Sequence, residues 1–159
     1  MTEQDTSARL QDSIRSASDT RTALRIRGGD SKAFYGRNTG GDVLDISAHR
    51  GIVNYEPTEL VITARAGTSL SALEQALDAQ RQMLAFEPPH YGDTATLGGT
   101  IACNLSGPRR AAAGAARDFV LGTRIINGKG EILSFGGEVM KNVAGYDVSR
   151  LMCGALGTL

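Results

Sequence analysis

The sequence is short of the residues that would suggest a disulfide scaffold, a metal centre or a basic surface. It has no tryptophan, two cysteines and two histidines, and its 17 Lys and Arg residues equal its 17 Asp and Glu residues. A chain without net positive charge lacks the attraction for phosphates on which nucleic-acid binding depends, so we expect no nucleic-acid partner. Its apolar runs are too short to cross a bilayer, which predicts no transmembrane segment.

The two cysteines, Cys103 and Cys153, lie far apart in the sequence and in apolar surroundings. Two lone cysteines neither frame a disulfide scaffold nor supply the ligands of a zinc or iron–sulfur centre, so we expect no metal site. Residues 1–18 are polar and lack the apolar core of a secretory signal. These observations predict two buried, reduced thiols in a cytoplasmic protein.

Glycine is the abundant residue. The chain has 20 glycines, roughly twice the usual share, and 13 of them lie between Gly92 and Gly157. This density indicates either a loop-rich domain without a ligand or a backbone that a ligand approaches closely. The count by itself does not separate these two interpretations.

Segments with strand and helix patterns alternate along the chain, which favours an α+β or α/β domain. The patterns predict strands at residues 23–26, 43–46, 60–64, 118–126 and 131–135. They predict helices at residues 7–17, from a cap at Thr68 or Ser69 onward, and at residues 143–152. Asn127-Gly128 indicates a hairpin turn between the last two strands, and Pro88-Pro89 indicates a subdomain boundary.

The first candidate site follows the first predicted strand, in the sequence Arg27-Gly28-Gly29-Asp30-Ser31-Lys32. Glycines let successive backbone N–H groups point at one anion, and the Ser31 hydroxyl and Lys32 ammonium add donors, which suits a diphosphate. The spacing matches neither a P-loop nor a GxGxxG fingerprint. A plain Gly-Gly turn with solvated charges is an equal alternative.

A second candidate extends over residues 94–107, where hydroxyls and one amide interrupt a run of small residues. A planar ligand could lie against such a backbone, although close packing at the start of a helix explains the same residues equally well. The residues concerned are Thr96, Leu97, Gly98, Gly99, Asn104 and Gly107. A third segment, residues 141–150, is more simply explained as a solvated helix with an Asp147–Arg150 pair.

The chain ends on Gly157-Thr158-Leu159, without a polar tail. Natural termini are usually solvated and mobile. We therefore expect a C-terminally truncated sequence that is inactive by itself, with a short native protein as the alternative.

Four longer stretches carry a resemblance to a known family: residues 49–55, 87–92, 117–125 and 136–147. Together with the three candidate segments, they resemble the vanillyl-alcohol-oxidase/PCMH family of FAD-binding flavoproteins over nearly the whole chain. Within that family, the similarity is to the FAD-binding subunits of bacterial glycolate oxidases.

The resemblance implies an α+β fold of the PCMH-type FAD-binding class. Its two subdomains would be a small parallel βα unit at about residues 1–88 and a mixed sheet with helices at about residues 89–159, without the family's cap domain. FAD would lie between them, with its diphosphate at residues 27–32. Its flavin and ribityl chain would lie along residues 96–99, Asn104 and Gly107, and Gly157 would belong to a segment that completes the site.

Two departures from the family pattern concern the diphosphate loop. Asp30 stands where relatives carry a small neutral or amide residue, and its carboxylate would repel a diphosphate unless it points outward or pairs with Lys32 or Arg27. The loop also has no histidine, the residue that tethers FAD in many relatives, so we expect non-covalent FAD. We interpret His90, which lies nearer the second segment, as a packing residue.

The resemblance implies hydride transfer from the carbon of a small 2-hydroxy acid to the flavin. The implied partners are the larger catalytic subunit and the iron–sulfur subunit of a glycolate oxidase complex, in the cytoplasm or attached through them to the inner membrane. We identify no catalytic residue: Arg109 and Arg110 are expected in a solvated or interface patch, and nothing marks Tyr146. Three roles remain open: an enzyme component, a non-catalytic FAD-binding or scaffold subunit, and a fragment that binds nothing.

Overall fold

The computed structural model describes residues 4–138 and 145–159. Its helices are α1 (Ser7–Thr20), α2 (Leu70–Asp78), α3 (Leu97–Cys103), α4 (Arg110–Ala113) and α5 (Val148–Met152). Its strands are β1 (Leu24–Arg27), β2 (Asp42–Asp45), β3 (Ile52–Glu56), β4 (Val61–Ala64), β5 (Gly122–Ile126) and β6 (Ile132–Gly136). The 3-10 helices η1 (Pro57–Glu59) and η2 (Ala116–Phe119) precede β4 and β5.

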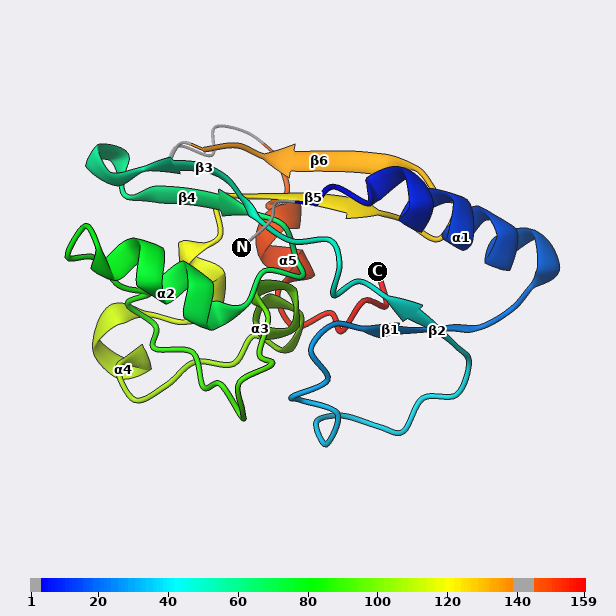
Figure 1. Cartoon of the computed structure of the whole chain (residues 1–159), viewed down its shortest axis with the longest axis horizontal. Helices are drawn as coiled ribbons and strands as arrows, with labels where there is room; N and C mark the ends of the chain where they lie inside the picture. Colours follow the sequence, from blue (N-terminus) through cyan, green and yellow to red (C-terminus); the bar gives the residue numbers. More distant parts are fainter. Residues whose placement is uncertain (1–3, 139–144) are drawn as a thin grey trace.

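The described strands pair in twos. Strands β1 and β2 are parallel, whereas β3–β4 and β5–β6 are antiparallel. In Figure 1 the two antiparallel pairs lie along one side of the molecule, and α1 lies beside β5–β6. Helices α2, α3 and α4 lie on the other side, and the β1–β2 pair lies next to the C-terminus. The parallel pair lies in the first half of the chain, which also holds the antiparallel β3–β4 pair.

The connection between β1 and β2 positions the first candidate site. Parallel neighbours need a crossover that returns the chain to the same end of the sheet, most often a helix. Here residues 28–41 make that crossover as a loop of turns and bends. The loop begins with Gly28 and Gly29, so the candidate diphosphate residues leave the carboxyl end of β1 directly.

The core lies between α2 and the β3–β4 pair. Leu70 and Leu73 of α2 are buried together with Ala95. The partly buried apolar residues packed against them are Ile52, Ile62, Ala64, Leu84 and Leu97. Ser69 is the N-cap of α2, because its hydroxyl accepts a hydrogen bond from the N–H of Ala72 at 3.3 Å. Of the two caps considered, Thr68 is instead buried and accepts a hydrogen bond from the N–H of Gly51 at 2.9 Å.

Local backbone contacts move the ends of two predicted strands. The predicted strand at residues 118–126 is wrong at its start, since the Asp118 carboxylate accepts a hydrogen bond from the N–H of Ala115 at 2.9 Å and winds η2. The predicted strand at residues 60–64 begins one residue later, because Leu60 is left-handed with φ +58°. Strand β3 was not predicted at all. The predicted hairpin of β5 and β6 is confirmed, with the N–H of Gly130 bonded to the carbonyl of Asn127 at 2.9 Å.

Two helices also differ from the prediction at their ends. Helix α1 continues beyond residue 17 to Thr20 and stops where Arg21 takes a left-handed conformation, φ +55°. Helix α5 begins at Val148, after Asp147 caps it, rather than at residue 143. Residues 143 and 144 of that prediction lie outside the described part of the chain.

Both thiols are less enclosed than their apolar surroundings predicted. Cys103 and Cys153 are free, as expected, but each is half-buried rather than buried. In residues 4–138 and 145–159, no cluster of three or more His, Cys, Asp or Glu side chains could hold a metal ion. The described helices are all too short or too polar to span a membrane.

Candidate functional site

The base of the candidate diphosphate loop is held by an ion pair between neighbouring strands. Arg27, the last residue of β1, lies opposite Asp45, the last residue of β2. Its guanidinium donates a hydrogen bond to the Asp45 carboxylate at 2.8 Å. Hydrogen bonds from Ser47 and then from Arg27 lower the pKa of Asp45 to about 2. Arg27 therefore braces the loop rather than offering an unpaired cation.

Gly28 and Gly29 bring the loop against the start of α3. A side chain on Gly28 would place its Cβ 2.9 Å from the Thr96 hydroxyl. A Cβ on Gly29 would overlap the backbone carbonyl of Thr94. A side chain at Gly28 would displace the Thr96 hydroxyl, and none fits at Gly29, so the two glycines allow the first and second candidate segments to meet this closely.

The small residues at the start of α3 are used first for packing. Thr96 caps the helix, since its hydroxyl accepts a hydrogen bond from the N–H of Gly99 at 3.2 Å. The N–H of Leu97 donates to Thr68 and that of Gly98 to Ala66, each at 2.8 Å. The first turn of α3 thus uses three of its backbone N–H groups inside the protein. Two interpretations of this segment were open, ligand binding and close packing. Close packing explains Leu97 and Gly98, because their N–H groups are bonded within the protein.

Unlike Arg27, Lys32 of the loop has a charged group without a hydrogen-bond partner among the described residues. The residue is only 9% exposed, and its Nζ is buried without a hydrogen-bond partner in the described part of the chain. Burial lowers the pKa of its ammonium, and the nearby Cys103 thiol of α3 acts in the opposite direction. The neighbouring Ser31 is half-buried and makes no side-chain hydrogen bond within residues 4–138 and 145–159. A buried ammonium without a partner is a costly arrangement that an anion would relieve.

Asp30 forms no ion pair with this ammonium among the described residues. Its backbone is left-handed, φ +57°. Its half-exposed carboxylate lies 4.0 Å from the guanidinium of Arg25. Of the expected arrangements, the outward orientation is the one observed. Among the described residues Asp30 forms no ion pair with Lys32 or Arg27, because its carboxylate lies beside Arg25 and Arg27 is bonded to Asp45.

Residues 154–157, near the C-terminus, contact helix α3 and strand β1. The N–H groups of Gly154 and Leu156 donate to the carbonyls of Ile101 and Ala102, at 3.0 and 3.1 Å, and so satisfy the end of α3. A Cβ on Gly157, which has φ +74°, would lie 2.6 Å from Cδ1 of Ile26 in β1. The loop at residues 27–32, helix α3 and Gly157 are therefore brought together around β1.

Asn104 and Gly107 have other contacts. Asn104 ends α3 in a left-handed conformation, and its side-chain oxygen accepts a hydrogen bond from the N–H of Arg117 at 3.2 Å. The N–H of Gly107 donates to the carbonyl of Phe86 at 2.8 Å. A Cβ on Gly107 would overlap the backbone of Glu87. These hydrogen bonds join other segments of the fold and do not reach the loop at residues 27–32.

The third segment and the other singled-out residues behave as surface features. Asp147 and Arg150 form the expected i, i+3 pair at 3.2 Å, and Tyr146 is exposed. Residues 141–144 lie outside the described residues. His90, expected to be a packing residue, instead shares a hydrogen bond with Glu74, with 2.9 Å between Nε2 and the carboxylate oxygen. Arg109 and Arg110 are exposed.

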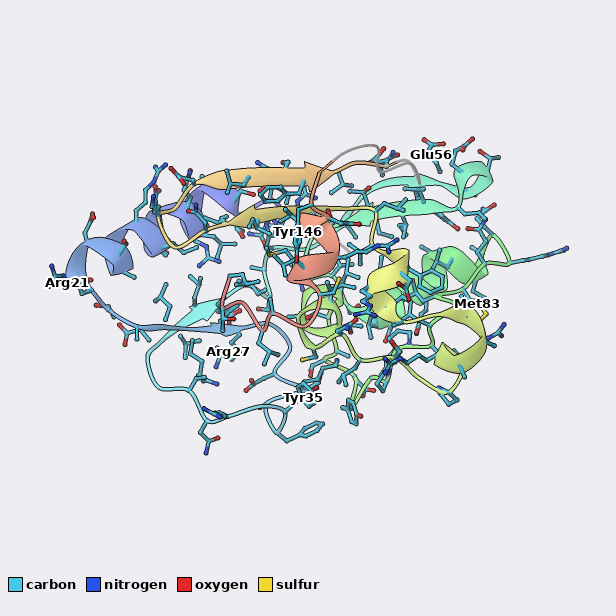
Figure 2. All side chains as sticks on the ribbon, turned by 180° about the vertical axis from the view of Figure 1, so that it is seen from behind. Arg21, Arg27, Tyr35, Glu56, Met83 and Tyr146 are labelled. Atoms are coloured by element: carbon cyan, nitrogen blue, oxygen red, sulfur yellow. The ribbon has the colours of Figure 1, made fainter. Side chains whose placement is uncertain are left out.

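A hollow of about 630 Å³ lies on a different face, between α2 and residues 82–88. Its lining includes Glu74, Asp78, Met83, Glu87 and Pro108. Figure 2 shows Met83 well away from Arg27 and Tyr35, which mark the candidate loop. The residue pattern did not predict this hollow, and none of the candidate cofactor residues lines it.

Thr100 and Cys103 of α3 were not predicted as part of the candidate site. Thr96, Thr100 and Cys103 follow one another at intervals of four and three residues, so they share one face of α3. Thr100 is fully buried, and its hydroxyl has no hydrogen-bond partner in the part of the chain that the structure describes. The helical spacing could have indicated this face if residues 97–103 had been predicted as a helix.

These residues fit the FAD diphosphate that the family resemblance implied. Gly28 and Gly29 form a turn without side chains, and Lys32 supplies a buried cation without a partner among the described residues. A flexible glycine turn and a positive charge are what a diphosphate requires. The residues of the loop are therefore compatible with the cofactor.

Comparison with known proteins gives the same assignment. Residues 3–136 match the model of a family described as an FAD binding domain. The chain is 60% identical over 155 residues to glycolate oxidase subunit GlcE of Escherichia coli (strain K12), covering 98% of this chain and 44% of that protein. It is 33% identical over 122 residues to glycolate oxidase subunit GlcD of Bacillus subtilis (strain 168), covering 76% of this chain and 25% of that protein.

A D-lactate dehydrogenase and a solved structure also match the chain. The D-lactate dehydrogenase of Anaerostipes hadrus is 33% identical over 120 residues, covering 76% of this chain and 25% of that protein. The solved structure of alkyldihydroxyacetonephosphate synthase superposes with a TM-score of 0.73 at 19% identity, covering 96% of this chain and 30% of that one. The chain thus spans less than half the length of these relatives.

The comparisons confirm the family prediction, the α+β FAD-binding fold and FAD as the cofactor. They leave the subdomain boundary near residue 88 and the individual cofactor contacts as predictions. The chain belongs to the family described as an FAD binding domain, and glycolate oxidase subunits and a D-lactate dehydrogenase are among the proteins that it resembles.

Proposed function

We propose that this chain is the FAD-binding domain of a glycolate oxidase subunit that works with a GlcD-type catalytic subunit and an iron–sulfur subunit. The substrate of the complex is glycolate or a related small 2-hydroxy acid. The similarity to GlcE along 98% of the chain supports the assignment to this complex. The observation in the structure that carries it is the meeting of the glycine loop, α3 and Gly157 beside the buried ammonium of Lys32.

In this proposal the residues of the loop hold the diphosphate of a non-covalently bound FAD. The backbone of Gly28 to Ser31 and the ammonium of Lys32 face the phosphates, and Arg27 keeps the loop attached to β2. Helix α3 and Gly157 shape the wall along which the flavin lies, with Thr96 to Gly99 at its start. FAD supplies the acceptor for the hydride, while these residues bind and orient it.

A non-catalytic FAD-binding or scaffold subunit is the second candidate. One observation favours it: the arginines next to the loop already have carboxylate partners. Arg27 is bonded to Asp45, and Arg25 lies 4.0 Å from Asp30. A 2-hydroxy acid needs an unpaired cation for its carboxylate and a base for its hydroxyl proton. In the proposed site the unpaired ammonium of Lys32 faces the diphosphate, so on this alternative the catalytic partner contributes both the cation and the base.

The test uses the full-length protein. We expect the purified subunit to carry flavin absorbance that acid precipitation releases from the polypeptide, as non-covalent binding requires. If the subunit is catalytic, glycolate bleaches this absorbance without any partner; if it is a relay or scaffold, bleaching requires addition of the purified GlcD-type partner. A protein that neither retains nor takes up FAD would contradict the proposal and leave the inactive fragment as the remaining interpretation.

The location proposed for the complex is the cytoplasm, with attachment to the inner membrane through the partner subunits. Cell fractionation of a tagged subunit tests this, with and without the genes for its partners. Membrane recovery that depends on the partners agrees with the proposal, and recovery that does not depend on them contradicts it.

A further inference from the structure

The buried ammonium of Lys32 has no hydrogen-bonded counter-charge among the described residues. Lys32 is 9% exposed and its Nζ has no hydrogen-bond partner within residues 4–138 and 145–159. Asp30 of the loop lies beside Arg25, and Asp45 at the end of β2 is bonded to Arg27, so neither carboxylate is paired with Lys32. Buried charges in proteins are normally paired, so an isolated one requires an explanation.

The loop places this charge over one face of α3. Gly28 lies against the Thr96 hydroxyl at the first turn of the helix. Lys32 lies near Cys103 at the last turn, close enough for the two groups to influence each other electrostatically. Thr100 shares this face, and its hydroxyl is buried without a hydrogen-bond partner among the described residues. The loop therefore approaches this face of α3 at both of its ends, and the face carries polar groups beside the charge of Lys32.

We propose that Lys32 is the counter-charge of the cofactor's diphosphate, so that the site is electrostatically incomplete until a diphosphate binds. The inference rests on the proposed FAD-binding function and extends it. It assigns the binding of the diphosphate charge to the Lys32 ammonium, whereas the backbone N–H groups of a glycine loop could otherwise bind the diphosphate alone. It also implies that the diphosphate is the recognised group, whether it comes from FAD, ADP or pyrophosphate.

An uncompensated buried charge destabilises the free protein, and pairing it stabilises the complex. Removing the charge of Lys32 should therefore stabilise the free protein and destabilise the complex with FAD. In Lys32→Met, which keeps the length and apolar stem of the side chain, the apoprotein melts at the same temperature as wild type or higher. The increase in melting temperature on adding FAD is smaller than in wild type. A residue with a purely structural role would lower both temperatures together.

The test uses flavin-free full-length protein and measures FAD binding by quenching of flavin fluorescence, with pyrophosphate and ADP as competitors. We expect Lys32→Met to weaken FAD binding by about 10- to 100-fold, the range for a hydrogen bond to a charged group. Pyrophosphate should compete with FAD in wild type and fail to do so in the variant. Lys32→Arg keeps the charge and should retain more affinity than Lys32→Met. Lys129→Met, at an exposed lysine in the β5–β6 turn, is the matched control and should bind as wild type does.

The outcomes separate this inference from the proposed function. Wild type and Lys32→Met binding FAD equally well, within about twofold, would overturn the role of Lys32 and leave FAD binding intact. A protein that binds pyrophosphate through Lys32 but not FAD would support the counter-charge and contradict the proposed function. Wild type that binds neither ligand would overturn both.

Discussion

Arg27 and Asp45 face each other across the parallel β1–β2 pair, and the guanidinium donates a hydrogen bond of 2.8 Å to the carboxylate. The pair stands at the point where the chain leaves β1 for the glycine loop. It also removes from the loop the arginine that sequence reasoning had included among the cofactor-binding residues. Both consequences follow from the register of β1 and β2, which places Arg27 opposite Asp45 although residues 28–41 separate the two strands in the sequence.

Replacing Asp45 by asparagine tests this bracing role. The ion pair is partly exposed, so we expect Asp45→Asn to lower the melting temperature by only about 2 °C or less. The effect on FAD binding should be larger than this small loss of stability suggests, because the loop loses its anchor on β2. Thermal melting and flavin-fluorescence quenching of the same samples measure the two effects. FAD binding unchanged by Asp45→Asn would show that Arg27 does not brace the loop.

The same carboxyl predicts a dependence of stability on acid. Folding lowers the pKa of Asp45 from 3.8 to about 2. A group whose pKa folding depresses adds stability above its unfolded pKa and loses it as the pH falls. This contribution is therefore complete above about pH 4 and disappears between about pH 4 and about pH 2. Urea unfolding across this range should show a shallower loss for Asp45→Asn than for wild type, and parallel curves would contradict the prediction. Asp19→Asn, at an exposed position of α1, is the control.

The approach of Gly29 to Thr94 leaves no room for a side chain. We expect Gly29→Ala to destabilise the protein by about 1–3 kcal/mol, the usual cost of overpacking, and to weaken FAD binding by displacing the loop. Chemical denaturation gives the first quantity, and flavin titration gives the second. Gly40→Ala is the matched control in the same loop, because a Cβ there meets no atom within 4 Å. Equal stabilities of the two variants would show that the close approach does not exist.

The hydroxyl of Thr96 caps α3. Substitution by valine keeps the shape of the side chain and removes the acceptor for the N–H of Gly99, so we expect a loss of about 1 kcal/mol. Thr58→Val changes an exposed threonine of η1 in the same way and should have little effect. Urea midpoints compare the two variants with wild type. A stability of Thr96→Val equal to that of Thr58→Val would contradict the capping role.

The thiol of Cys153 should react slowly at neutral pH. Burial raises its pKa to about 11, and Asp147 adds to the effect. Because the thiolate is the reactive form, we expect alkylation by iodoacetamide near pH 7.5 to be roughly a few hundredfold slower than that of free cysteine. The rate should keep increasing as the pH is raised towards about 10. Mass spectrometry of the intact protein against time measures the rate. Labelling as fast as free cysteine would show that the thiol is exposed.

Local interactions explain which parts of the fold were predictable. The apolar stripe of α2 and the Asn127 turn between β5 and β6 depend on residues close in sequence, and both were predicted. Strand β3 was missed, because its polar residues hide the alternation and its partner β4 supplies the pairing. The start of β5 was wrong because one carboxylate, Asp118, closes a turn that propensity does not indicate.

The sequence by itself identified the glycine loop and lysine after β1 as a candidate anion site, and its similarity to the FAD-binding domain family identified the cofactor. Tertiary structure decided which charges of that loop remain available. Arg27 pairs with Asp45 through the strand register, Asp30 turns towards Arg25, and Lys32 is buried against α3 without a partner among the described residues. The physical reason is that burial and ion pairing depend on which distant segments meet, whereas the types of residue in the loop only limit the choices.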